Sequence, residues 1–166
     1  MNAFWTYFWP CFAAGLVVGL FSGVFGFRKR SRRNLVLVVG ALASLGLGAL
    51  WHGPLGGAHR FSQTIERQVG EALNYYEMTK ITAHLHHAPL TRRLLLSGPA
   101  DDFQRSELVR LLNQLPGVRE TVWSSGGGGV PLIAEGLGVA LLGFLLGLLL
   151  AYLFELRRRY NAQWNW

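Results

Sequence analysis

Three long apolar runs dominate the hydropathy pattern of the chain and cover residues 4–26, 35–51 and 130–154. The hydrocarbon core of a bilayer is crossed by roughly 20 apolar residues in a helix. The runs therefore predict three transmembrane helices, of which the second is short. The basic residues lie outside all three runs, whereas one carboxylate, Glu135, lies near the start of the third.

The segment 55–125 between the second and third runs has the mixed pattern of a small globular domain. Apolar positions at helical spacing predict a helix over residues 59–76. A second helix is expected after Asp101, with Gln104 as the capping-box partner. Period-two alternation predicts a strand at residues 81–86. Two further strands are expected at residues 91–97, with Leu94 and Leu96 on one face, and at residues 118–123. The predicted fold is thus a membrane α-helical protein with three transmembrane helices plus a small α+β extramembrane domain of αββαβ order.

The chain divides by composition into five consecutive segments. We expect a transmembrane hairpin over 1–54 with a basic loop at 27–34, an extramembrane domain over 55–125, a glycine linker at 126–129, a third transmembrane helix over 130–154 and a basic, aromatic tail over 155–166.

Two short motifs in the extramembrane segment, Leu94-Leu95-Leu96-Ser97-Gly98 and Leu115-Pro116-Gly117-Val118-Arg119, carry a family resemblance. With the expected element order, they resemble the BON domain of bacterial envelope proteins. The matching motif residues are Leu96, Ser97, Gly98, Pro116, Gly117 and Val118. The first strand departs from the family pattern, because histidines stand at positions 84, 86 and 87. The resemblance implies attachment to phospholipid surfaces, to other envelope proteins or to itself, and it implies no catalytic residues.

The net charge of +7 is concentrated in two short segments next to apolar runs, while the domain is nearly balanced. The basic residues of these segments are Arg28, Lys29, Arg30, Arg32 and Arg33, and Arg157, Arg158 and Arg159. This distribution is not the basic stripe of a nucleic-acid-binding protein. Because cytoplasmic loops concentrate Lys and Arg, we expect both segments to be cytoplasmic and to contact anionic lipid. The expected location is a bacterial inner membrane, with the N-terminus and the domain in the periplasm and the C-terminus in the cytoplasm.

Aromatic residues gather at the predicted outer end of the first span, and we expect them to form a belt at the headgroup level. They are Phe4, Trp5, Tyr7, Phe8 and Trp9.

Small residues recur about every four positions in each apolar run and predict faces for close helix packing. They are Gly15, Gly19 and Gly23 in the first run, Gly40, Ser44 and Gly48 in the second, and Gly136, Ala140, Gly143, Gly147 and Ala151 in the third. We expect the first two runs to pair through these faces as a hairpin. The third stripe is the strongest packing stripe, and the small-residue faces together favour association with other membrane helices, either of this protein's own copies or of other membrane proteins.

Candidate chemistry is sparse. The single cysteine, Cys11, excludes an internal disulfide. His84 and His86 share a strand face but have no third ligand at suitable spacing, so we expect no metal and no cofactor. An ionisable residue at membrane depth is a functional candidate, and Glu135 is either a carboxylate reaching headgroups or a basic partner, or a proton relay.

These features favour a non-catalytic membrane scaffold or accessory subunit that presents the BON-like domain for protein or phospholipid attachment within a larger complex. The alternative is a proton-coupled or pH-sensing transport or signalling component that uses Glu135 or the histidines.

Overall fold

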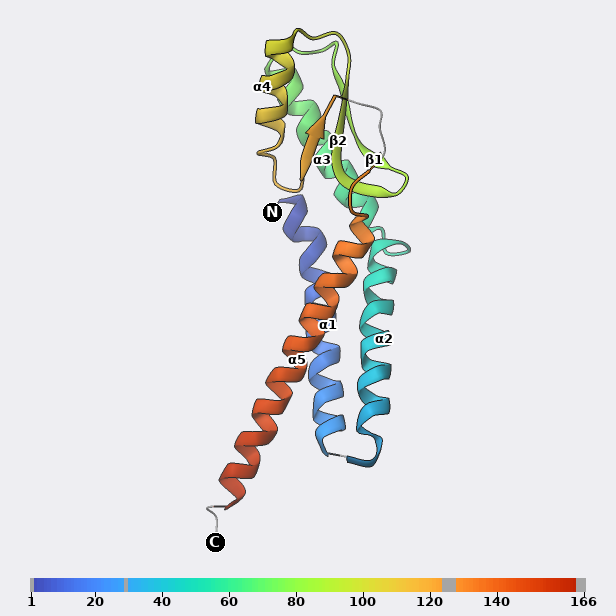
Figure 1. Cartoon of the computed structure of the whole chain (residues 1–166), viewed down its shortest axis with the longest axis vertical. Coiled ribbons are helices and arrows are strands. Elements are labelled where there is room, and N and C mark those ends of the chain that lie inside the picture. The colour runs from blue at the N-terminus through green and yellow to red at the C-terminus, as the bar shows by residue number, and fades with distance from the viewer. Residues whose placement is uncertain (1, 29, 124–127, 164–166) are drawn as a thin grey trace. The chain divides into compact units, whose positions relative to one another are not determined.

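The computed structural model describes residues 2–28, 30–123 and 128–163, which are mostly helical. The chain forms two compact units (Figure 1). The domain unit consists of Met1–Tyr7 and Gly56–Glu135, and the helical unit consists of Phe8–Leu55 and Gly136–Trp166.

Three helices of the chain are long and apolar enough to cross a membrane, as the hydropathy pattern predicts. They are α1 (Ala3–Arg28), α2 (Arg33–His52) and α5 (Leu132–Gln163). In the helical unit they run side by side (Figure 1). The loop predicted at 27–34 is shorter in the structure. α1 extends through Arg28 and α2 begins at Arg33, and a 3₁₀ turn (η1) occupies Arg30–Arg32 between them.

The segment predicted as a C-terminal tail is a continuation of α5 through Gln163. Glu155 forms ion pairs with Arg158 and Arg159, three and four residues further along the helix. Pairs at this spacing stabilise helices, so the polar end of the run keeps the helical conformation. Trp164 and Trp166 lie outside the described residues.

The domain unit contains two helices and a three-stranded sheet (Figure 1). Along the chain its elements are α3 (Gly57–Tyr75), β1 (Thr82–His87), β2 (Leu90–Ser97), α4 (Asp102–Leu112) and β3 (Glu120–Val122). The strand order in the sheet is β1-β2-β3. β1 and β2 form an antiparallel hairpin, whereas β3 runs parallel to β2 after the α4 crossover. The last strand is shorter than predicted.

The core of the domain unit is built from one face of the sheet and the apolar stripes of the two helices. Leu85 pairs with Leu94, and Leu94 pairs with Thr121, so these three side chains point to the same face. Fully burying an aliphatic or aromatic side chain contributes roughly 1.5–3 kcal/mol. Further buried core residues are Leu96 from the sheet, Phe61, Ile65, Val69 and Leu73 from α3, and Leu108 and Leu112 from α4.

The start of α4 follows the sequence prediction. The Asp101 carboxylate accepts a hydrogen bond from the Gln104 backbone N–H at 2.7 Å, and the Gln104 side chain accepts one from the Asp101 N–H at 3.2 Å. This reciprocal capping box satisfies two N–H groups at the helix end and fixes where α4 begins.

The first turns of α1 differ from the predicted aromatic belt. The Tyr7 ring packs on Phe61 of α3, with 5.6 Å between ring centroids, and Tyr7 and Phe8 are both buried. Trp5 and Trp9 are half-exposed, as interfacial aromatic residues would be. A helix turns its side chains by about 100° per residue, so five aromatic residues this close together cannot all face the same surroundings.

Two glycines shape the turns that precede α4 and β3. Gly98 has φ +131° and lies against the Lys80 carbonyl, and Gly117 has φ +117° and lies against Ile65 and Phe61. Residues with a Cβ rarely adopt this backbone conformation. Both turns therefore require glycine for conformation and for space.

We predict that Gly98→Ala and Gly117→Ala each destabilise the domain unit by about 2–4 kcal/mol, because backbone strain and overpacking add. Gly70→Ala in α3 is the matched control. Since open space surrounds Gly70, alanine there should be neutral or should stabilise by up to about 1 kcal/mol. Hydrogen–deuterium exchange of β1 and β2 peptides in the detergent-solubilised full chain measures the difference. Equal protection in all three variants would contradict this account.

Candidate functional site

The closest helix contact in the helical unit joins α1 to α5. A Cβ added to Gly15 would overlap the Ala140 carbonyl oxygen, and one added to Gly19 would overlap that of Phe144. From the other side, Cβ atoms on Gly143 and Gly147 would overlap the carbonyl oxygens of Phe12 and Leu16. The two backbones therefore touch along two successive turns of each helix. Only glycine permits this approach.

The small residues of α2 meet both neighbouring helices. Gly40 lies against Ser22 of α1 and Phe144 of α5, while Gly48 lies against Leu137. The Ser44 hydroxyl is fully buried and donates a hydrogen bond to the Ala140 carbonyl oxygen at 3.2 Å. Interhelical hydrogen bonds of this kind hold membrane helices together.

The expected pairing of the α1 and α2 glycine faces is wrong in detail. All eleven small residues named from the sequence are buried. However, the α1 face (Gly15, Gly19 and Gly23) lies against α5, where Ala151 meets Gly23. The physical reason is complementarity: α5 offers two glycines that admit the α1 backbone, whereas α2 offers Ser44 between its two glycines.

Glu135 forms an ion-pair cluster in the domain unit. Arg92 donates to one carboxylate oxygen at 3.0 Å and Arg119 to the other at 3.3 Å. The Glu135 side chain is only 16% exposed and that of Arg92 18%. The Arg92 guanidinium also lies over the Phe4 ring, 5.1 Å from its centroid. Charge-assisted bonds of this kind compensate the cost of burying a carboxylate.

Backbone contacts bring these charges together. The Arg119 N–H donates to the Arg92 carbonyl oxygen at 2.8 Å, which holds Arg119, the residue before β3, beside Arg92 of β2. Thr91 forms an isolated bridge with Pro131, one turn before Glu135. Arg92 also donates to the Gly117 carbonyl oxygen at 2.9 Å, so it ties together three segments far apart in sequence.

Sequence reasoning singled out Glu135 but missed Arg92 and Arg119. One signal was present: period-two alternation puts Arg92 on the same strand face as Leu94 and Leu96, which is the core face. An arginine pointing inward needs a buried carboxylate partner, and Glu135 supplies it. Arg119 had no such signal, because no regular spacing links it to residue 135.

The three histidines of the first strand, His84, His86 and His87, do not share a common partner among the residues that the structure describes. His86 shares a hydrogen bond with the Pro89 carbonyl oxygen at 3.0 Å, while His87 contacts the Glu66 carboxylate at 2.9 Å and His84 is exposed. A bulge between Leu85 and His87 interrupts the alternation predicted for this strand. Within the described residues, no three His, Cys, Asp or Glu side chains gather as a metal site would require.

The residues of the BON-like motifs occupy turns and core positions. Leu96 and Val118 are buried, and Gly98 and Gly117 are the turn residues with positive φ. The Ser97 hydroxyl lies 2.7 Å from that of Thr82 across the hairpin, and exposed Pro116 bridges to Val118. Their placement assigns them local structural roles.

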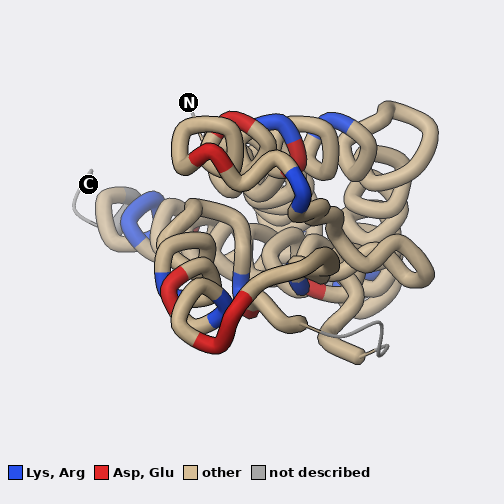
Figure 2. Tube along the Cα trace, turned by 90° about the horizontal axis from the view of Figure 1, so that it is seen from above, with Lys and Arg blue, Asp and Glu red and all other residues tan. Residues whose placement is uncertain are grey.

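Charge in the domain unit is mixed. Along the Cα trace, positions of Lys and Arg alternate with positions of Asp and Glu (Figure 2). Several are used in pairs, including Arg93 with Glu120 and Arg110 with Glu107. Of the linker predicted at 126–129, residues 126 and 127 lie outside the described residues, and Gly128 and Gly129 both have positive φ.

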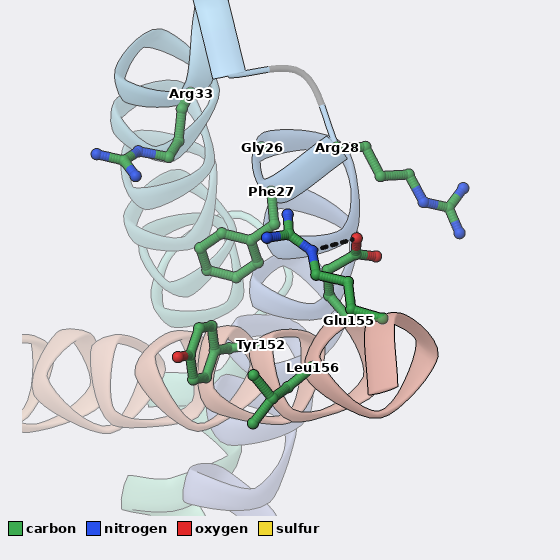
Figure 3. Close-up of a pocket in the computed structure, with 8 residues that line it drawn as sticks. Gly26, Phe27, Arg28, Arg33, Tyr152, Glu155 and Leu156 are labelled. Carbon is green, nitrogen blue, oxygen red and sulfur yellow. Dashed lines mark hydrogen bonds and ion pairs between the residues drawn. The ribbon is translucent and has the colours of Figure 1, made fainter. Parts of the chain in front are cut away.

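The basic segments meet at a cleft of about 500 Å³ in the helical unit (Figure 3). It is lined by Gly26, Phe27, Arg28, Arg33, Tyr152, Glu155, Leu156 and Arg159. Phe27 and Tyr152 face each other in an edge-to-face contact, with 5.8 Å between centroids. Arg32, Arg157 and Arg158 are exposed outside the lining, and Lys29 lies outside the described residues.

In comparisons with protein families, curated proteins and solved structures, no significant match to this chain was found.

We predict that Gly19→Ala and Gly147→Ala lower the thermal midpoint of the detergent-solubilised chain by about 5–10 °C, because each added methyl forces two backbones apart. Gly46→Ala and Gly138→Ala are matched controls in α2 and α5, where nothing lies within 4 Å. Their midpoints should stay near that of the unsubstituted chain. Fluorescence-detected size-exclusion chromatography after heating measures all four. A common shift would refute close packing as the cause.

We predict that Glu135→Gln destabilises the domain unit by about 2–3 kcal/mol, because two arginines lose their carboxylate and Arg92 is nearly buried. Glu71→Gln is the control: its ion pair with Arg67 is 4.0 Å long and exposed, so its effect should stay below about 0.5 kcal/mol. Hydrogen–deuterium exchange of the β1 and β2 peptides in the detergent-solubilised full chain provides the comparison. A Glu135→Gln variant as stable as Glu71→Gln would remove the structural role of the cluster.

Proposed function

We propose that this chain is a non-catalytic scaffold or accessory subunit of a bacterial inner membrane, and that its BON-like domain of αββαβ order serves attachment to a protein or phospholipid partner in the periplasm. The observation that carries the proposal is the backbone contact of α1 with α5. It makes the three apolar helices a tightly packed anchor, while the domain has a core of its own.

The use of the polar groups also supports an attachment role. Glu135 is held by Arg92 and Arg119, and Glu66 is held by His87 and by the Leu85 backbone N–H at 3.2 Å. Carboxylates bound this way stabilise the fold. A proton relay through Glu135 would have to break two ion pairs at each transfer.

Exposed aromatic residues on the domain unit offer a surface for attachment. Tyr75 at the end of α3 is 81% exposed and Phe103 in the first turn of α4 is 74% exposed. Aromatic side chains contribute strongly to binding surfaces because they bury large areas at a small entropy cost.

The proposed orientation puts the basic segments in the cytoplasm and the domain in the periplasm. In a Cys11→Ala background, Ser97→Cys should react with a membrane-impermeant maleimide in cells whose outer membrane is permeabilised. Ser31→Cys should react only after lysis. Both serines are exposed, so any difference in labelling reports the membrane rather than burial. The reverse labelling pattern would overturn the orientation.

The attachment role is tested by a mild-detergent pull-down of the full chain with quantitative mass spectrometry. We expect Tyr75→Ala/Phe103→Ala to reduce recovery of the specific partner at least about tenfold, as loss of two interface aromatics implies. Arg67→Ala/Glu71→Ala, an exposed pair on α3, is the control and should leave recovery unchanged. If Glu135→Gln or His84→Ala/His86→Ala abolishes the protein's function in cells while its folding and its partner recovery are unchanged, the proton-coupled alternative replaces the scaffold.

A further inference from the structure

The cleft between the ends of α1, α2 and α5 combines a charged rim with an aromatic wall. Arg28, Arg33 and Arg159 line it together with a single carboxylate, Glu155. Arg159 donates to Glu155 at 3.2 Å and Arg158 lies 3.7 Å from it, so this carboxylate is already neutralised. The cleft therefore keeps a positive excess.

Two of these arginines are available to a ligand. Arg28 and Arg33 are exposed, and among the described residues neither forms an ion pair. Figure 3 shows their side chains extending from α1 and α2 in opposite directions on either side of Phe27. Long arginine side chains reorient at little cost, so both guanidinium groups can turn toward an anion at the opening.

The walls of the cleft are apolar. Phe27, Tyr152 and Leu156 form them, and the exposed Leu149 and Leu153 continue the Leu156 face of α5. The cleft thus lies where three apolar helices end, with acyl-compatible surface beside it and guanidinium groups at its rim. Basic pockets of this kind between membrane helices suit anionic headgroups.

We propose that this cleft is a specific binding site for the phosphodiester headgroup of an anionic glycerophospholipid. Arg28 and Arg33 contact the phosphate, Arg159 is positioned by Glu155 at the side of the cleft, and the acyl chains run along the exposed apolar surface of the helices. The proposal deepens the proposed function and rests on its membrane location.

The test is native mass spectrometry of the full chain in a neutral detergent, titrated separately with phosphatidylglycerol, phosphatidylcholine and inorganic phosphate. We expect phosphatidylglycerol to bind at least about tenfold more tightly than phosphatidylcholine, and inorganic phosphate not to compete at matched concentration. Equal binding of the two lipids would overturn the site. Equal competition by inorganic phosphate would assign it to a free anion instead.

A matched pair of double variants separates the cleft from general basicity. Arg28→Gln/Arg33→Gln should weaken phosphatidylglycerol binding about tenfold, whereas Arg32→Gln/Arg157→Gln removes the same charge outside the lining and should change it less than about twofold. Equal weakening would show diffuse attraction and refute the cleft. Size-exclusion profiles verify folding, and the lipid comparison on the unsubstituted chain decides the question if a variant misfolds.

The outcome is independent of the attachment role. Lipid binding measured in detergent does not depend on the orientation of the chain in a membrane or on a protein partner. Loss of lipid selectivity with intact partner recovery therefore refutes only the cleft. Loss of partner recovery with intact selectivity refutes only the attachment role.

Discussion

The backbone contact between α1 and α5 is the constraint on which the helical unit depends. Apolar side chains gain little by leaving lipid for another helix, so association in a membrane depends on close packing and on hydrogen bonds. Gly15 and Gly19 on one helix and Gly143 and Gly147 on the other bring the main chains into contact. At this separation Cα–H groups face carbonyl oxygens, a weak but repeated interaction.

The same contact sets the role of α2. Because α5 covers the glycine face of α1, α2 packs on its neighbours through the Ser44 hydroxyl and through Gly40 and Gly48. It forms no second backbone contact of the α1–α5 kind through these residues. The bond from Ser44 to the Ala140 carbonyl oxygen is the polar counterpart of the glycine contact. Leucines and valines cover the remaining, exposed side of α2, which is the composition expected for a lipid-facing surface.

Sequence patterns predicted the helices and strands of this protein better than the contacts between them. Apolar runs, alternation and the Asp101 capping box gave the three long helices, the sheet strands and the start of α4, because each signal is local. The two carboxylates of α5 show the limit. Glu155 pairs with arginines three and four residues away, a spacing visible in any helix. Glu135 pairs with Arg92 and Arg119, which only the sheet register and the Thr91–Pro131 bridge bring near.

The packing of the glycine faces is a second example of contacts that local sequence patterns do not predict. Their four-residue spacing identified which side of each helix packs, yet it did not identify the partner helix, because all three runs carry a similar stripe. The choice depends on the opposing residues: α5 presents Gly143 and Gly147 to α1, whereas α2 has Ser44 between its two glycines. The basic cleft had no signal as a unit, since its arginines come from three helices and its aromatic wall from two.

Both carboxylates of α5 are bound by arginine, and the helix between them carries no charge. Its contacts with α1 and α2 include backbone against glycine and one serine hydroxyl on a carbonyl oxygen. Ser22 and Ser44 are the buried serines that α1 and α2 provide among the described residues. Ser22 lies against Gly40 of α2 and Ser44 donates to the Ala140 carbonyl oxygen of α5, so both hydroxyls contribute to the packing of neighbouring helices.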